Sequence, residues 1–134
     1  MRILALLALF MIGSATVASA AEDVTAGQSV IRAQEEALSR DDAATAYTFA
    51  SPGIQRRFHD PETFLSMVRN GYTPVYRHRS FEFGEAKASD GAILQEVHII
   101  DANGVAWEAL YTLKTQPDGS LKISGCVLTK AVIS

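Results

Sequence analysis

Three turn signals divide residues 89–119, which read SDGAILQEVHIIDANGVAWEALYTLKTQPDG. Each signal combines Asp, Asn or Pro with a glycine, the residue that takes up the positive φ of a tight turn without steric cost. The signals are Ser89-Asp90-Gly91, Asp101-Ala102-Asn103-Gly104 and Pro117-Asp118-Gly119. Between them, apolar and polar residues alternate with the period of a half-buried strand. Because such short turns join neighbouring strands directly, we expect an antiparallel meander. Its four predicted strands span residues 76–88, 92–101, 105–115 and 121–130.

The residues before the meander follow a helical period. The T-x-x-Q spacing at 25–28 is typical of a capping box, so a first helix is predicted over 26–39. Asp41 or Asp42 can cap a second helix. We expect the Pro-Gly pair at 52–53 to end it, because the residue before a proline disfavours helical backbone. These two helices are predicted to form a hairpin.

The clearest helix start is Asp60-Pro61-Glu62. It joins a capping carboxylate, a proline whose missing N–H costs nothing at the first turn, and an acid at the positive end of the helix dipole. Asn70-Gly71 is a matching stop signal for this third helix. Helices followed by a meander predict an α+β fold, in which the N-terminal helices pack on the apolar face of a four-stranded antiparallel sheet. We expect one domain over residues 21–134.

Residues 1–20 have the parts of a Sec-type signal peptide. Arg2 precedes an apolar core over 3–12, and Ala-Ser-Ala at 18–20 forms an A-x-A cleavage site. Cleavage is expected between Ala20 and Ala21, which predicts a periplasmic or secreted protein with no membrane attachment after cleavage. The alternative is an uncleaved anchor, although the second half of the segment is polar for a span of about 20 residues.

Composition excludes several classes of function. The 134 residues carry 12 Lys+Arg against 15 Asp+Glu, a net charge of −3, which argues against a dedicated nucleic-acid-binding protein. A single cysteine excludes an internal disulfide framework and a cysteine-rich zinc site. No His-x-x-x-His, G-x-S-x-G, phosphate-loop or dinucleotide motif is present, so neither a metal nor a cofactor is expected. Five arginines make the middle of the chain basic, either as a solvated face or as an anion-binding patch. They are Arg56, Arg57, Arg69, Arg77 and Arg79.

Strand alternation separates two sets of polar residues. Gln95, Trp107 and Tyr111 fall on the more apolar faces of their predicted strands. An amide among apolar and aromatic groups can orient a ligand, or it can satisfy a buried backbone group. Both interpretations of Gln95 stay open.

Glu96, His98 and Glu108 fall on the opposite faces. A histidine beside carboxylates can form a general base or a metal site, but a solvated strand face shows the same pattern. We assign no catalytic residue from the sequence.

The densest polar and aromatic cluster lies where the third helix leads into the first strand. It consists of Tyr72, Tyr76, Arg77, His78 and Arg79. Its arginines can bind an anion in forked geometry. Alternatively, the tyrosines pack under the loop and the arginines pair with surface acids. The candidate ligand-binding residues are therefore Tyr72, Tyr76, Arg77, Arg79, Gln95, Trp107 and Tyr111.

Cys126 follows Gly125 on the last predicted strand. A small buried hydrophobe is the expected role of this cysteine, with an intermolecular disulfide or a redox thiol as the alternatives.

The chain resembles a family of short exported bacterial proteins classed as a domain of unknown function. The similarity covers most of residues 30–128. It is carried by Ser51-Pro52-Gly53-Ile54, Phe58, Asp60-Pro61, Phe64, Met67-Val68, Gly71-Tyr72, Pro74-Val75-Tyr76-Arg77, Phe83-Gly84 and Gly125-Cys126. The order of elements is similar to the nuclear-transport-factor-2-like fold (cystatin-like or SnoaL-like), a cone in which a curved sheet wraps the helices. That resemblance implies a pocket at the open end of the cone.

Two classes of function follow as expectations. The first is a non-enzymatic exported module that either holds a small apolar or anionic ligand or pairs as a homodimer through its sheet face. The second is an isomerase or dehydratase of the kind some members of this fold represent, with an acid or histidine in the pocket as its base.

Overall fold

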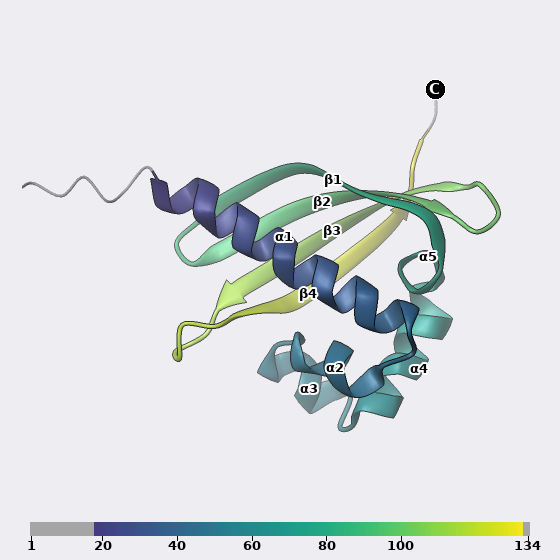
Figure 1. The fold of residues 1–134 in the computed structure, drawn as a ribbon, viewed down its shortest axis with the longest axis horizontal. Helices are drawn as coiled ribbons and strands as arrows, with labels where there is room; N and C mark the ends of the chain where they lie inside the picture. The colour runs from purple at the N-terminus through teal and green to yellow at the C-terminus, as the bar shows by residue number, and fades with distance from the viewer. Residues whose placement is uncertain (1–17, 133–134) are drawn as a thin grey trace, which may run out of the picture.

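The computed structural model describes residues 18–132 and has helices followed by a single antiparallel sheet (Figure 1). The helices are α1 (Ala18–Ser39), α2 (Ala43–Thr48), α3 (Pro52–Arg57), α4 (Pro61–Gly71) and α5 (Thr73–Tyr76). The strands are β1 (His78–Ser89), β2 (Ala92–Asp101), β3 (Ala106–Thr115) and β4 (Leu121–Lys130), in the sheet order β1-β2-β3-β4. The α+β class and the antiparallel meander are thus confirmed. The predicted leader and its apolar core lie largely outside the described residues.

The three predicted turns are present because each has a glycine in the left-handed region. The φ angles are 76° at Gly91, 82° at Gly104 and 87° at Gly119. L side chains rarely adopt this conformation, so these glycines set where the strands reverse.

Asp42 and Asp60 cap the second and fourth helices as expected. The backbone N–H of Thr45 donates to Asp42 Oδ1 over 3.2 Å, and that of Thr63 donates to Asp60 Oδ1 over 2.9 Å. The two carboxylates satisfy N–H groups that have no partner inside the helix.

Two sequence predictions about helix boundaries are wrong. Pro52-Gly53 does not end the second helix, because α2 already ends at Thr48, and Pro52 instead begins α3, which the Ser51 hydroxyl caps. A proline is well placed at a first helical turn, where its missing N–H would have no partner. The predicted capping box at 25–28 lies inside α1, where the Thr25 hydroxyl donates to the carbonyl of Ala21, one turn back, over 3.0 Å.

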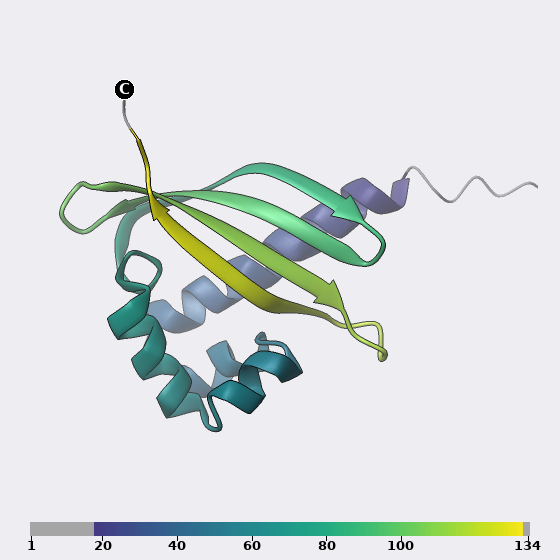
Figure 2. The ribbon, with the colours of Figure 1, turned by 180° about the vertical axis from the view of Figure 1, so that it is seen from behind.

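The core lies between the helices and one face of the sheet (Figure 2). Ile31 and Leu38 of α1 are buried together with Val97, Ile99 and Leu113 of the central strands. Alternation along β2 and β3 has the predicted parity, since the inward residues are buried and the helices leave the other face of the sheet open.

A short bridge holds the helical layer against the last strand. Ala50 pairs with Ile123 in a parallel bridge, the N–H of Ser51 donates to the Ile123 carbonyl over 2.8 Å, and the N–H of Ile123 donates to the Phe49 carbonyl over 2.8 Å. This bridge places α3 beside β4, although the two are far apart in the sequence.

Candidate functional site

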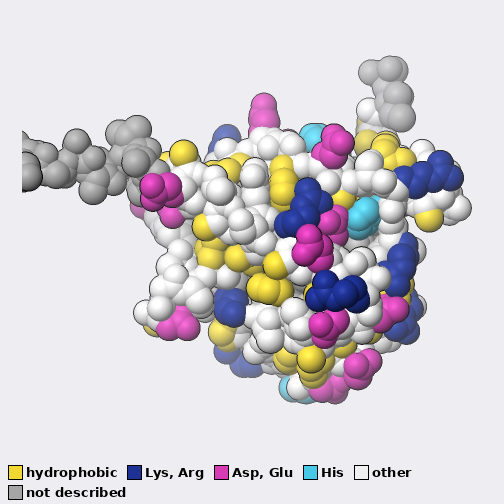
Figure 3. Space-filling view, in the orientation of Figure 1, with side chains coloured by type: hydrophobic (Ala, Val, Ile, Leu, Met, Phe, Trp, Pro, Cys, Tyr) yellow, Lys and Arg dark blue, Asp and Glu magenta, His cyan; other side chains and the backbone are white. Residues whose placement is uncertain are grey.

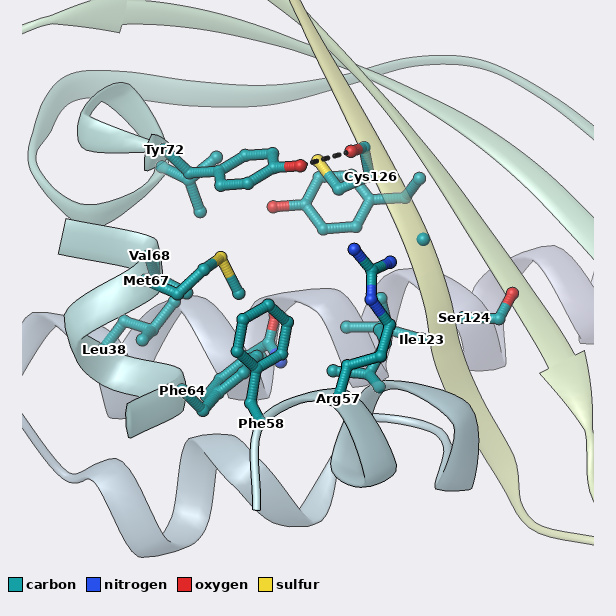
Figure 4. A pocket seen from close by; sticks show the side chains of 15 residues that line it. Leu38, Arg57, Phe58, Phe64, Met67, Val68, Tyr72, Ile123, Ser124 and Cys126 are labelled. Atoms are coloured by element: carbon teal, nitrogen blue, oxygen red, sulfur yellow. Dashed lines mark hydrogen bonds between the residues drawn. The ribbon is translucent and has the colours of Figure 1, made fainter. Parts of the chain in front are cut away.

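A pocket of about 350 Å³ lies where α3 and α4 face β4 (Figure 4). It is lined by Gln34, Leu38, Ile54, Arg57, Phe58, Phe64, Met67, Val68, Tyr72, Val75, Tyr111, Ile123, Ser124, Gly125 and Cys126. The lining residues come from α1, α3, α4, α5, β3 and β4 and from the segments that join them. Packing of the helical layer on the sheet therefore creates the pocket.

Aromatic packing holds the helical side of the pocket in place. The rings of Phe58 and Phe64 are T-shaped, with centroids 6.5 Å apart. The Tyr47 hydroxyl donates to the carbonyl oxygens of Gln55 and Phe58 over 3.1 and 2.7 Å. These bonds hold the end of α3 and orient Phe58 toward the pocket.

The neutral polar groups of the pocket are mostly used by the protein itself. The Tyr72 hydroxyl donates to the Cys126 carbonyl over 3.1 Å (Figure 4), and Gln34 Nε2 donates to the Ala46 carbonyl over 3.2 Å. Arg57 is different, because it is the only charged residue among the lining residues that the structure describes. Its guanidinium points from the end of α3 into the pocket (Figure 4).

Cys126 and Tyr111 contribute uncharged groups to the wall formed by the sheet. Burial raises the pKa of the Cys126 thiol to about 12, and burial likewise raises the pKa of Tyr111 well above its usual value. Both groups are therefore neutral at neutral pH. Because almost none of Cys126 is present as the thiolate, it is a poor nucleophile.

Of the sequence-predicted site residues, Tyr72 and Tyr111 line this pocket. Trp107 lies outside it and lines a neighbouring hollow of about 520 Å³ to which Tyr72 and Cys126 also belong. The indole N–H of Trp107 donates to Asp101 Oδ2 over 2.9 Å. Tyr72 thus lies between the two spaces.

Gln95 is fully buried and lines neither space. Its amide nitrogen donates to the carbonyl oxygens of Gly84 and Glu96 over 3.1 and 2.8 Å, and its amide oxygen accepts from Gln28 Nε2 over 3.1 Å. The β1–β2 register shifts between Phe83 and Ala86, which leaves the Gly84 carbonyl needing a partner. Of the two interpretations of Gln95, the structure shows the one in which it satisfies buried backbone.

Tyr76 and Arg77 do not line the pocket, and both contact Asp41 instead. The guanidinium carbon of Arg77 lies 3.8 Å from the centroid of the Tyr76 ring. The guanidinium also donates to Asp41 Oδ2 over 3.2 Å and to the Leu38 carbonyl over 3.1 Å. The Tyr76 hydroxyl also donates to Asp41. The exposed Arg79 lies beside the β2–β3 turn. On the face that carries α1, acidic and basic side chains are interspersed (Figure 3).

Glu96, His98 and Glu108 project from the open face of the sheet, away from the pocket. His98 Nδ1 lies 3.8 Å from Glu108 Oε1, and both side chains are about half exposed. Within residues 18–132, no three His, Cys, Asp or Glu side chains are grouped so as to hold a metal ion. Among the described helices, none has both the length and the apolar character needed to cross a bilayer.

Sequence reasoning missed most of the pocket. Arg57 was visible only as one member of a basic run, while Phe58, Phe64 and Met67 resemble ordinary core residues. No sequence signal joins them to Cys126, because the 50–123 bridge that brings α3 to β4 has no local motif.

Comparison with known proteins identifies one family. The model of a domain of unknown function (DUF4864) matches residues 20–133. Neither the curated proteins nor the solved structures contain a significant match to the chain. Since the family model covers most of the sequence, the protein belongs to the DUF4864 family.

Proposed function

We propose that this protein is an exported, non-enzymatic binding protein that holds a small, largely apolar ligand in the pocket between α3, α4 and β4. The observation that carries the proposal is the pocket itself, about 350 Å³ in volume with Phe58, Phe64, Met67 and Val68 in its walls. Ligand sites in proteins are typically concave and mostly apolar, with volumes of roughly 300–1,000 Å³ and a few polar groups that set orientation.

The polar groups of the pocket favour binding over acid–base catalysis. The lining residues that the structure describes include no carboxylate and no histidine, which are the usual general bases. The hydroxyl of Tyr72 and the amide of Gln34 already donate to backbone carbonyls. Such groups shape and orient a bound molecule without taking a proton from it.

Export and a cone-shaped fold complete the proposal. The signal-peptide pattern in residues 1–20 supports export, and the DUF4864 match begins at residue 20, beside the predicted cleavage point. A sheet that curves over the helices supports a nuclear-transport-factor-2-like cone (Figure 2).

A pocket-filling substitution tests the binding function. We expect isothermal titration calorimetry to detect binding of 1-decanol, a neutral apolar probe, to the purified protein. Met67→Trp places an indole in the pocket, so it should abolish that binding. Ser66→Trp adds the same side chain at an exposed neighbour outside the pocket and should leave binding intact. Unchanged 1-decanol affinity in a Met67→Trp protein that retains its melting temperature would contradict the proposal.

A second candidate function, homodimerisation through the open sheet face, is favoured by one observation. Leu94, Leu110 and Val127 are 42%, 40% and 61% exposed, and the register places Leu110 directly opposite Val127. Adjacent exposed apolar residues on a sheet often mark an interface. Sedimentation equilibrium should then show a dimer that Leu110→Lys dissociates, whereas a monomer at all concentrations would exclude this candidate.

A further inference from the structure

Among the lining residues that the structure describes, Arg57 alone is charged. From this we propose that Arg57 binds the carboxylate of an amphipathic ligand, such as a medium-chain fatty acid, whose apolar chain lies between α4 and β4. This inference rests on the proposed binding function and specifies the chemical class of the ligand.

The position of Arg57 suits an anchor for a head group. It is the last residue of α3, and its guanidinium points into the pocket (Figure 4) while the side chain remains exposed to solvent. Its guanidinium carbon lies 5.8 Å from the centroid of the Phe58 ring. Tyr47 holds the Phe58 carbonyl over 2.7 Å, so the backbone beside Arg57 is fixed. A bound carboxylate would therefore stay near water, which lowers the cost of desolvating it.

Arg57 also has free hydrogen-bonding capacity. Two arginines that lie near the helices already have acidic partners, since Arg32 contacts Glu35 at 2.7 Å and Arg77 contacts Asp41 at 3.2 Å. Within residues 18–132, no carboxylate oxygen lies within 4.0 Å of the Arg57 guanidinium. A guanidinium has five N–H donors, and its fork matches the two oxygens of a carboxylate.

The charge of the pocket favours a monoanion. Arg57 supplies one positive charge, and no lysine or second arginine is among the lining residues that the structure describes. A carboxylate is neutralised by one guanidinium, whereas a phosphate monoester carries a charge of about −1.5 to −2 and needs further donors. A single arginine above apolar walls therefore selects an organic acid over a phosphate.

The size of the pocket indicates the length of the apolar part. A volume of about 350 Å³ lies at the small end of the roughly 300–1,000 Å³ range of ligand pockets, so a medium-chain acid such as decanoate suits it better than a long-chain one. Met67 projects into this space (Figure 4), and its flexible thioether can adapt to chains of different shape.

Isothermal titration calorimetry with decanoate and 1-decanol at neutral pH tests the proposal. The titrations use the unchanged protein, Arg57→Gln and Arg56→Gln. In the unchanged protein, decanoate should bind about tenfold or more tightly than 1-decanol, because the charge-assisted fork exists only with the acid. Arg57→Gln should remove that preference and leave 1-decanol binding within about twofold. Arg56→Gln, an exposed neighbour outside the pocket lining, is the matched control and should retain the preference.

The outcomes separate this inference from the proposed function. If both probes bind with equal affinity, or if Arg57→Gln and Arg56→Gln behave alike, the carboxylate anchor is wrong and the binding function stands. If neither probe binds to the folded protein, the proposed function fails and the inference fails with it. Loss of decanoate affinity in Arg57→Gln alone supports both.

Discussion

His78 and Glu35 form a partly buried pair that joins the start of β1 to α1. His78 Nε2 lies 2.9 Å from Glu35 Oε2, and His78 Nδ1 lies 2.9 Å from the carbonyl oxygen of Pro74. A carbonyl oxygen only accepts, so Nδ1 must carry a proton. The contact between Nε2 and the carboxyl oxygen then requires one more proton, on the ring or on the carboxyl group. Glu35 Oε2 is buried and has no hydrogen-bond partner among the described residues, so the 2.9 Å contact with His78 is what offsets its burial.

Removal of His78 should therefore destabilise the fold. In His78→Leu, Glu35 Oε2 is left buried without its partner, and we expect a loss of about 1–3 kcal/mol in the free energy of unfolding. Urea denaturation measures it. The exposed His59 provides the control, since His59→Leu should change stability by about 0.5 kcal/mol or less. Equal effects of the two substitutions would show that the pair contributes nothing.

Gln95 should be more sensitive than its neighbours on β2. Gln95→Leu removes the donor to the carbonyls of Gly84 and Glu96 inside the sheet, and we expect a loss of about 2–4 kcal/mol. Glu96→Gln, on the exposed face of the same strand, should have little effect. If urea denaturation shows Gln95→Leu to be as stable as the unchanged protein, water must replace the amide as the donor to these carbonyls.

Cys126 should resist alkylation in the folded protein. Because burial raises its pKa to about 12, the thiolate fraction at pH 8 is about 10⁻⁴, against about 10⁻¹ for a thiol with the ordinary value of 9.0. We expect iodoacetamide to react roughly a thousandfold more slowly with the native chain than with the chain in denaturant. The native rate should rise about tenfold per pH unit while the fold persists.

Since Cys126 is the only cysteine of the chain, mass spectrometry reports on it directly. Native and denatured rates that agree at pH 8 would show that the thiol is accessible and ionised in the folded protein.

Tyr72 should limit the length of the bound chain. Its side chain lies between the pocket and the hollow that contains Trp107, and its hydroxyl donates to the Cys126 carbonyl. Tyr72→Ala should join the two spaces. We expect the ratio of the affinity for tetradecanoate to that for decanoate, measured by calorimetry, to rise about tenfold. Tyr72→Phe retains the ring and should keep the original preference. An unchanged preference in Tyr72→Ala would place the chain elsewhere.

Local chemistry in the sequence determined the strands, the turns between them and two of the helix starts, whereas it did not predict α3 and α5. Glycines at 91, 104 and 119 dictate where the strands reverse, and carboxylates at Asp42 and Asp60 dictate where helices begin. Strand alternation also predicts which side chains face inward. These features depend on residues a few positions apart, so they can be inferred without the fold.

Only the tertiary structure decided which polar side chains contact one another. The sequence shows that Arg57 and Arg77 are both cationic, but only the structure places Asp41 beside Arg77 and an apolar pocket beside Arg57. The bridge between Ala50 and Ile123 sets α3 against β4 and so places Arg57 at the pocket, whereas Arg77 meets Asp41 because the α1–α2 turn lies beside the start of β1. Contacts between segments so far apart depend on how whole elements pack, and no local periodicity encodes them.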